Sequence, residues 1–161
     1  MTTKKGKAGA SKIEFSTNVG FSSIARALPV LSASDFRTQV VANGGTLEDF
    51  GSNTDWQNEI TRQAMTKNYN LSLGGGASKL TYYAAFGAQM QQGILKNNQL
   101  DRLTGRMNVN QKFWDDRLSL DANISFSNTV NERPAIESLL GTALSNNPTL
   151  PTYAQDGKTP A

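Results

Sequence analysis

Apolar and polar residues alternate with a period of two along five stretches of the chain. Successive side chains of a β-strand point to opposite faces of a sheet, so each stretch predicts a strand with one apolar and one polar face. In the first stretch, for example, Ile13, Phe15 and Val19 alternate with Glu14 and Ser16. The five predicted strands lie near residues 11–23, 67–74, 79–92, 101–113 and 117–129.

Short and long connections alternate between these strands. Residues 74–78 (Gly-Gly-Gly-Ala-Ser) and residues 114–117 (Trp-Asp-Asp-Arg) are short enough for antiparallel hairpins, and glycine supplies the positive backbone angles that such turns need. A long connection runs from Ser22 to Lys67, and a medium one runs from Gly93 to Leu100. The pattern therefore predicts an all-β fold, an antiparallel meander of about five strands.

Helix signals occur only in the long connections. In a predicted helical loop at residues 32–63, Ser32 or Ser34 caps a short helix that ends at Asn43, and Thr54 caps a second helical turn. Beyond residue 131 a third short helix is predicted, with one apolar side formed by Ile136, Leu139, Leu140 and Leu144. The tail from Pro148 onward has no strand pattern.

Strands of roughly 9 to 11 residues with one apolar face fit two settings. One is a soluble antiparallel sheet that is packed on one side, and the other is the wall of a transmembrane barrel. A polar face of Asn, Gln, Ser, Thr and Arg, the alternating loop lengths, and aromatic residues near predicted strand ends (Tyr69, Phe113 and Trp114) favour the barrel. The alternative, a soluble β-sheet binding or adhesion module whose apolar face packs on its own helices, stays open.

Composition narrows the chemistry that the chain can perform. Its 161 residues allow one domain, but 37% hydrophobic residues leave a compact core poorly filled. The absence of His and Cys excludes disulfides, thiol chemistry and a Ser-His-Asp triad, and a net charge of +3 is too mild to imply nucleic acid. No apolar run approaches the roughly 20 residues of a membrane helix, and we expect no targeting signal in this chain.

A series of short motifs runs through nearly the whole chain. They are TTKKG at residues 2–6, LSASDFR at 31–37, NTDWQNEI at 53–60, NYNLSLGGG at 68–76, QGILKN at 92–97, LTGRMNVNQ at 103–111 and NPTLP at 147–151. In this order they resemble the SusC/RagA-type TonB-dependent outer-membrane transporters. Only about five of the roughly 22 strands of such a barrel are represented, so we expect a piece of a transporter.

The resemblance implies an organisation and a function. Residues 1–10 would be the end of a plug or a linker, residues 11–130 a partial β-barrel, and residues 131–161 an extracellular loop or tail. The chain would be a non-catalytic wall segment of an outer-membrane importer of glycans or peptides. The full-length protein would work with a SusD-like lipoprotein and with TonB, and the barrel would contact membrane lipid.

Candidate site residues lie on the predicted polar face, which would line the barrel lumen. Such residues would contact either the plug or the solute, and plug packing is the more common role. The candidates are Tyr83, Arg102, Arg106, Asn108, Asn110 and Asn123. We expect no cofactor, metal or catalytic constellation.

Other charged or glycine-rich segments have simpler interpretations. The run at residues 74–76 lacks the features of a phosphate loop and predicts a turn, and the adjacent Asp115 and Asp116 are expected to form the other turn. Lys4, Lys5 and Lys7 are expected to be a solvated terminus.

Five strands cannot close a barrel, so the predicted sheet has two open edges and an uncovered apolar face. The chain alone is therefore expected to aggregate, to self-associate through that face, or to fold its loop helices over Phe15, Phe86 and Phe126.

Overall fold

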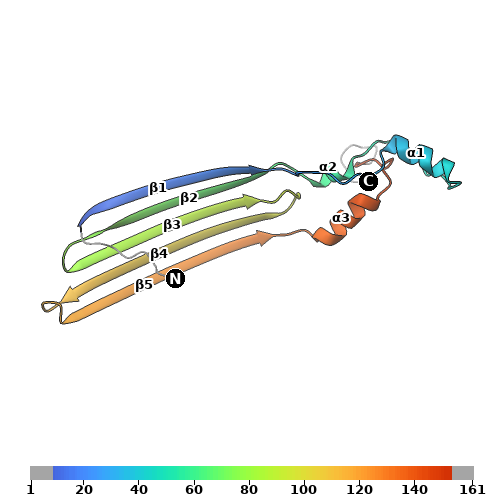
Figure 1. Cartoon of the computed structure of the whole chain (residues 1–161). Coiled ribbons are helices and arrows are strands. Elements are labelled where there is room, and N and C mark those ends of the chain that lie inside the picture. Colours follow the sequence, from blue (N-terminus) through green and yellow to red (C-terminus); the bar gives the residue numbers. More distant parts are fainter. Residues whose placement is uncertain (1–8, 154–161) are drawn as a thin grey trace. The chain divides into compact units, whose positions relative to one another are not determined.

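A computed structural model describes residues 9–153 and contains one five-stranded antiparallel sheet (Figure 1). The strands are β1 (Gly9–Ser22), β2 (Ala64–Gly76), β3 (Leu80–Gln92), β4 (Gln99–Phe113) and β5 (Leu118–Glu132). Their spatial order is their chain order, β1-β2-β3-β4-β5, so each strand pairs with the next along the chain. The predicted meander is confirmed, and most strands extend a few residues beyond the ends that alternation alone marked.

The first hairpin turn is shorter than predicted, because the three glycines belong to β2. Gly74, Gly75 and Gly76 pair with residues 81–83 of β3, and only residues 77–79 form the turn. A Cβ atom on Gly74 would lie 3.2 Å from the Tyr83 ring, and one on Gly75 would lie 3.0 Å from the Tyr82 hydroxyl. Gly74 and Gly75 therefore leave space for tyrosine side chains and, at Gly75, for the Ser11 backbone, whereas Gly76, with a φ of 153°, has the positive backbone angle expected of the turn.

The second hairpin turn is the predicted Trp114–Arg117 loop. Trp114, Asp115 and Asp116 have φ angles of 49°, 52° and 67°, a left-handed backbone that aspartate tolerates better than most residues. Asp115 pairs with Lys79 and Asp116 with Lys112, each at 3.3 Å between nitrogen and oxygen. The two carboxylates thus act as turn residues, as their positions predict.

Each strand presents one apolar and one polar face, and the register aligns these faces across the whole sheet. On the apolar face, Phe15 pairs with Leu71 and Leu71 with Phe86; on the polar face, Tyr83 pairs with Asn108 and Asn108 with Asn123. The sheet has no packed interior of its own. Among the described residues, the buried hydrophobic side chains are three alanines, Ala33, Ala64 and Ala143.

The remaining described segments, residues 23–63, 94–97 and 133–153, form a second compact unit, which we call the loop unit. It contains α1 (Ala33–Ala42), α2 (Trp56–Ile60) and α3 (Ile136–Ser145). None of the described helices has the length and apolar character needed to span a bilayer.

The helix ends follow local side-chain chemistry. Ser32 caps α1 by accepting a hydrogen bond from the Asp35 amide, and Asn43 lies at its C-terminus, as the sequence predicts. The predicted cap of α2 was wrong by one residue. Asp55 accepts the bond from the Asn58 amide, while the hydroxyl of Thr54 donates to the carbonyl of Leu150.

Candidate functional site

All six predicted site residues lie on the polar face of the sheet. Tyr83, Asn108 and Asn123 form a single row across β3, β4 and β5, because they are directly paired in the ladder. Asn110, two residues further along β4, donates hydrogen bonds to Asp121 at 2.9 Å and to Ser119 at 3.0 Å. This asparagine therefore ties β4 to β5 close to the hairpin turn.

The two predicted arginines lie in separate rows of β4. Arg106 is flanked by Ala85 and Ser125, and Arg102 is flanked by Gln89 and Thr129. Both are exposed, and neither makes a hydrogen bond or ion pair with any residue in the range 9–153.

A hollow of about 880 Å³ lies in the sheet between these rows. Most of its lining side chains are small, and its larger side chains include two of the predicted residues, Tyr83 and Arg106. The sequence reasoning missed its remaining polar members, which are Glu14, Ser16, Asn70, Ser72, Thr104, Ser125 and Ser127. Several of them lie beside Ala85 and Gly87 in the ladder, and a Cβ atom on Gly87 would lie 2.8 Å from the Thr104 hydroxyl and 3.2 Å from the Asn70 side-chain oxygen.

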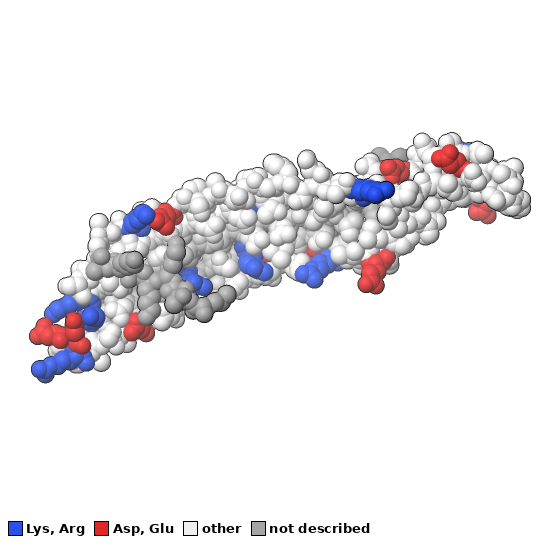
Figure 2. Space-filling model, in the orientation of Figure 1, with Lys and Arg blue, Asp and Glu red and all other residues white. Residues whose placement is uncertain are grey.

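The polar face of the sheet also carries charged side chains that form ion pairs with one another or with the hairpin turn. Lys12 pairs with Glu14 at 2.5 Å, and Lys112 pairs with Asp116 in the turn. Figure 2 shows charged side chains of both signs gathered at the hairpin-turn end of the sheet and others scattered over a mostly uncharged surface. The described residues contain no group of three or more His, Cys, Asp or Glu side chains placed to hold a metal ion.

The apolar face is exposed along its whole length. Ile13 is 69% exposed, Phe15 65% and Ile124 64%. Phe86 and Phe126, further along this face, are also exposed. Between the hairpin turns and the row that contains Met90, the apolar face carries no charged residue in the described strands; Lys67 and Asp101 lie in the Met90 row itself.

One aromatic prediction was wrong. Tyr69 lies in the middle of β2, paired with Thr17 and Ala88, because β2 begins three residues earlier than the alternation indicated. Tyr82 instead lies at the other end of the sheet, near the hairpin turns, where its hydroxyl shares a hydrogen bond with Ser11 across Gly75. Phe113 and Trp114 lie at the end of β4 as predicted, and Trp114 is 74% exposed.

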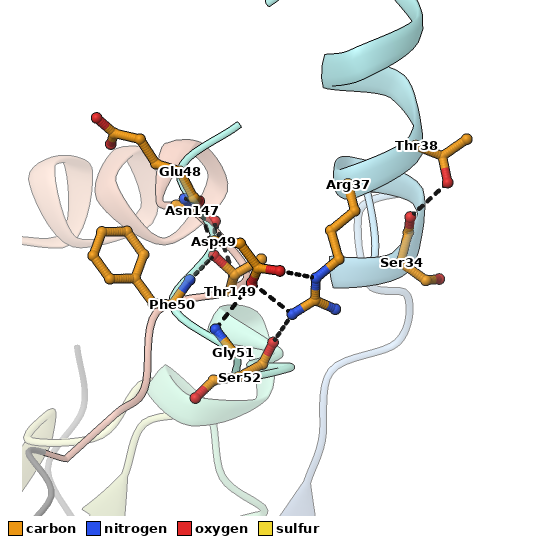
Figure 3. Close-up of polar contacts among 10 residues, drawn as sticks. All are labelled: Ser34, Arg37, Thr38, Glu48, Asp49, Phe50, Gly51, Ser52, Asn147 and Thr149. Atoms are coloured by element: carbon orange, nitrogen blue, oxygen red, sulfur yellow. Dashed lines mark hydrogen bonds and ion pairs between the residues drawn. The ribbon is translucent and has the colours of Figure 1, made fainter. Parts of the chain in front are cut away.

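In the loop unit, two segments about 100 residues apart in sequence are joined by hydrogen bonds (Figure 3). Thr149, which is 0% exposed, accepts from the Phe50 amide and lies within hydrogen-bond distance of the Glu48 carbonyl and the Asn147 side chain. The Asn147 amide group donates to the Glu48 carbonyl at 2.8 Å. The motif at residues 147–151 therefore holds the connection between β1 and β2 against the segment that follows α3.

An arginine–carboxylate pair adds to this arrangement. Arg37 of α1 donates two hydrogen bonds to Asp49, both at 2.8 Å, and a third to the Ser52 carbonyl (Figure 3). The Arg37 guanidinium and the Gly51 amide lower the pKa of Asp49 to about 2. Sequence reasoning did not identify this pair, because nothing in the residue pattern relates position 37 to position 49.

Trp56 and Asp55 have structural partners. The Trp56 ring nitrogen donates to the Asn147 carbonyl at 3.0 Å, and Asp55 caps α2. Their arrangement is that of a helix cap and an anchor for the loop segment.

Comparison with known proteins yields related sequences and structures, although no family model matches the chain. The chain is 32% identical over 160 residues to the TonB-dependent receptor SusC of Bacteroides thetaiotaomicron, covering 97% of this chain and 16% of that protein. It is 30% identical over 109 residues to the TonB-dependent receptor P3 of Formosa agariphila, covering 68% of this chain and 11% of the relative.

Solved structures of the RagAB peptide importer show the same fold. The closed-closed and open-open states each match with a TM-score of 0.67 and 23% sequence identity over 81% of this chain and 19% of the matched chain. The five-stranded antiparallel sheet therefore has the fold of part of that importer.

The two-faced sheet and these similarities show that the chain belongs to the family of TonB-dependent receptors. Within that family it corresponds to a segment of the SusC/RagA type and spans about a sixth of the length of SusC.

Proposed function

We propose that the chain forms part of the barrel wall of a SusC-like importer in the outer membrane, with its apolar face toward lipid and its polar face toward the lumen. The observation that supports this most directly is the exposure of the apolar face. A soluble protein would bury side chains such as Phe15, Phe86 and Phe126, and the alternative of a soluble binding module requires that burial.

The height of the apolar face fits a bilayer. Leu80 and Met90 mark its ends on β3 and are 90 − 80 = 10 residues apart, which is about 33 Å along a strand. A tilt of about 40° reduces this to a height of about 25 Å, which is the apolar band of outer-membrane barrels. Lys67 and Asp101 lie at the loop end of the band, where lipid headgroups and water solvate charges.

In this arrangement the six polar-face residues face an aqueous lumen. Tyr83, Arg102, Arg106, Asn108, Asn110 and Asn123 would then contact the solute or a plug that occupies the lumen. The long connection between β1 and β2 and the segment after β5 would be extracellular, while the hairpin turns 77–79 and 114–117 would be periplasmic.

The proposal for the activity of the whole protein rests on the relatives of the chain. These are named as TonB-dependent receptors and as a peptide importer. We propose import of a glycan or peptide, powered by TonB and assisted by a SusD-like lipoprotein. SusC-like receptors with these partners reside in the outer membrane, and we assign the full-length protein to that membrane.

Spin labelling tests the orientation of the two faces, because the chain has no cysteine and every introduced one is unique. Two pairs of cysteine variants compare neighbouring positions on opposite faces. Phe86→Cys (apolar face) is compared with Ala85→Cys (polar face) on β3, and Ile124→Cys (apolar face) with Asn123→Cys (polar face) on β5. In lipid vesicles, a nitroxide at Phe86 or Ile124 should collide mainly with oxygen, and one at Ala85 or Asn123 mainly with a water-soluble nickel complex. Equal access of the nickel complex to all four positions, or a folded chain in water without lipid or detergent, would contradict the proposal.

A further inference from the structure

Arg102 and Arg106 are the charged residues of the polar face that have no partner within residues 9–153. The other charged side chains of this face are engaged: Lys12 with Glu14, Lys112 with Asp116, and Asp121 with Asn110. An arginine keeps its charge at any pH at which the protein is folded, so both guanidinium groups remain positive in the lumen.

The surroundings of the two arginines leave room for a ligand. Thr104 lies between them on β4, and its neighbours in the ladder are Gly87 and Ser127. Ala85 and Ser125 flank Arg106. These small side chains form much of the floor of the 880 Å³ hollow, and Arg106 lies at its border together with Tyr83. A flat chain that lies over this floor meets Arg106, which lines the hollow, and continues along β4 to Arg102, which lies in the row beyond it.

We propose that this surface binds an extended peptide solute with carboxylates four residues apart, an inference that rests on the proposed lumen position of the polar face. Residues 102 and 106 are four apart on one strand, which is about 13 Å. An extended peptide that follows β4 has the same rise per residue, so side chains at its positions i and i+4 lie opposite both arginines. Each guanidinium then donates a pair of hydrogen bonds to one carboxylate.

A binding experiment tests charge and spacing together. The chain is refolded in detergent micelles and titrated against capped peptides that carry a neutral dye, with fluorescence anisotropy as the readout. The probes are Glu-Gly-Ser-Gly-Glu, its counterpart Lys-Gly-Ser-Gly-Lys, and Glu-Glu-Gly-Ser-Gly, in which the carboxylates are adjacent. We expect the first peptide to bind at least tenfold tighter than the lysine peptide, and several-fold tighter than the adjacent form. Equal affinity for all three peptides would overturn the proposal.

Variants locate the binding. Arg102→Gln and Arg106→Gln should each weaken binding of the first peptide by about two- to fivefold, the range of an exposed ion pair. Arg117→Gln is the matched control, because it also removes one positive charge but lies in the hairpin turn. If the Arg106→Gln variant bound the first peptide as tightly as the Arg117→Gln control, Arg106 would not be part of the binding surface.

A final measurement distinguishes a solute from a segment of the receptor itself. Ser125→Cys, next to Arg106, is treated with a maleimide in outer-membrane vesicles. A solute site predicts rapid modification that the first peptide slows. A thiol that is unreactive with and without peptide would show that a resident segment covers the surface, which overturns the solute assignment.

A chain that folds in micelles without discriminating the peptides refutes this inference alone, whereas a chain that folds in water refutes the barrel-wall function.

Discussion

The sheet and the loop unit are ordered by different interactions. The sheet is held by a backbone ladder that joins all five strands, with one irregularity in β1 between Gly9 and Lys12, and its side chains bury almost nothing. The loop unit has little regular structure, and side chains such as Thr149, Asn147 and Gln57 hold its backbone by hydrogen bonds. The contrast shows that the sheet depends on its surroundings to cover its apolar face, whereas the loop unit contains its own restraints.

The largest expected effect comes from placing a charge on one face of the sheet. Ile124→Arg should destabilise the lipid-embedded chain by about 2–4 kcal/mol, because the guanidinium would enter the apolar band. Asn123→Arg, one residue away on the polar face, should change stability by less than about 1 kcal/mol. Urea unfolding in lipid vesicles measures both variants, and similar losses would show that the two faces have the same surroundings.

In the loop unit, the most sensitive position is a buried hydroxyl. Thr149→Val keeps the shape of the side chain but leaves the Phe50 amide without its acceptor, which costs about 1–3 kcal/mol. Hydrogen exchange at residues 48–52 should accelerate, while exchange in the strands should not change. Thr38→Val, at an exposed position of α1, is the control and should have little effect; equal acceleration by both variants would exclude a specific role for Thr149.

A smaller effect is expected where an aromatic ring lies over glycine on the apolar face. A Cβ atom at position 105 would overlap the ring of Phe126, so Gly105→Ala should displace the ring and cost about 1 kcal/mol or slightly more. Gly20→Ala is the control, because nothing lies within 4 Å of its Cβ position. The same urea titration compares the two, and an unchanged midpoint for Gly105→Ala would show that the ring does not need that space.

The smallest effect should appear as a pH dependence confined to the loop unit. The Asp49 pKa is lowered from 3.8 to about 2, so its contribution to stability is complete above pH 4 and is lost as the pH falls toward 2. Exchange protection at residues 49–52 should therefore weaken over this interval, and Arg37→Gln should reduce the dependence, leaving the part that comes from the Gly51 amide. A dependence that persists unchanged in Arg37→Gln would mean that another group causes it.

Local features of the sequence predicted most of the fold. Alternation located all five strands, and Ser32 and Asn43 marked α1, because side-chain direction and helix capping depend on a few neighbouring residues. The six candidate site residues fall on one face for the same reason. The strand ends were less accurate, and the misplacement of Tyr69 followed directly from the late predicted start of β2.

Long-range details were not predicted. The space that Gly74 and Gly75 leave for Tyr83 and Tyr82 depends on the register between β2 and β3, and the same is true of the hollow above Gly87. The contact between Glu48 and Thr149 joins residues 101 positions apart, and no local pattern encodes it. Self-association of the chain stays a prediction.

The sequence by itself determined that each strand has an apolar and a polar side, because in a strand successive side chains point to opposite faces and the residue types alternate with the same period of two. Only the tertiary structure decided which residues on a side become neighbours, since this depends on how strands align across the sheet. It placed Tyr83 beside Asn108 and left Arg102 and Arg106 without a partner among residues 9–153. It also brought the motif at residues 147–151 onto a loop from the other half of the chain.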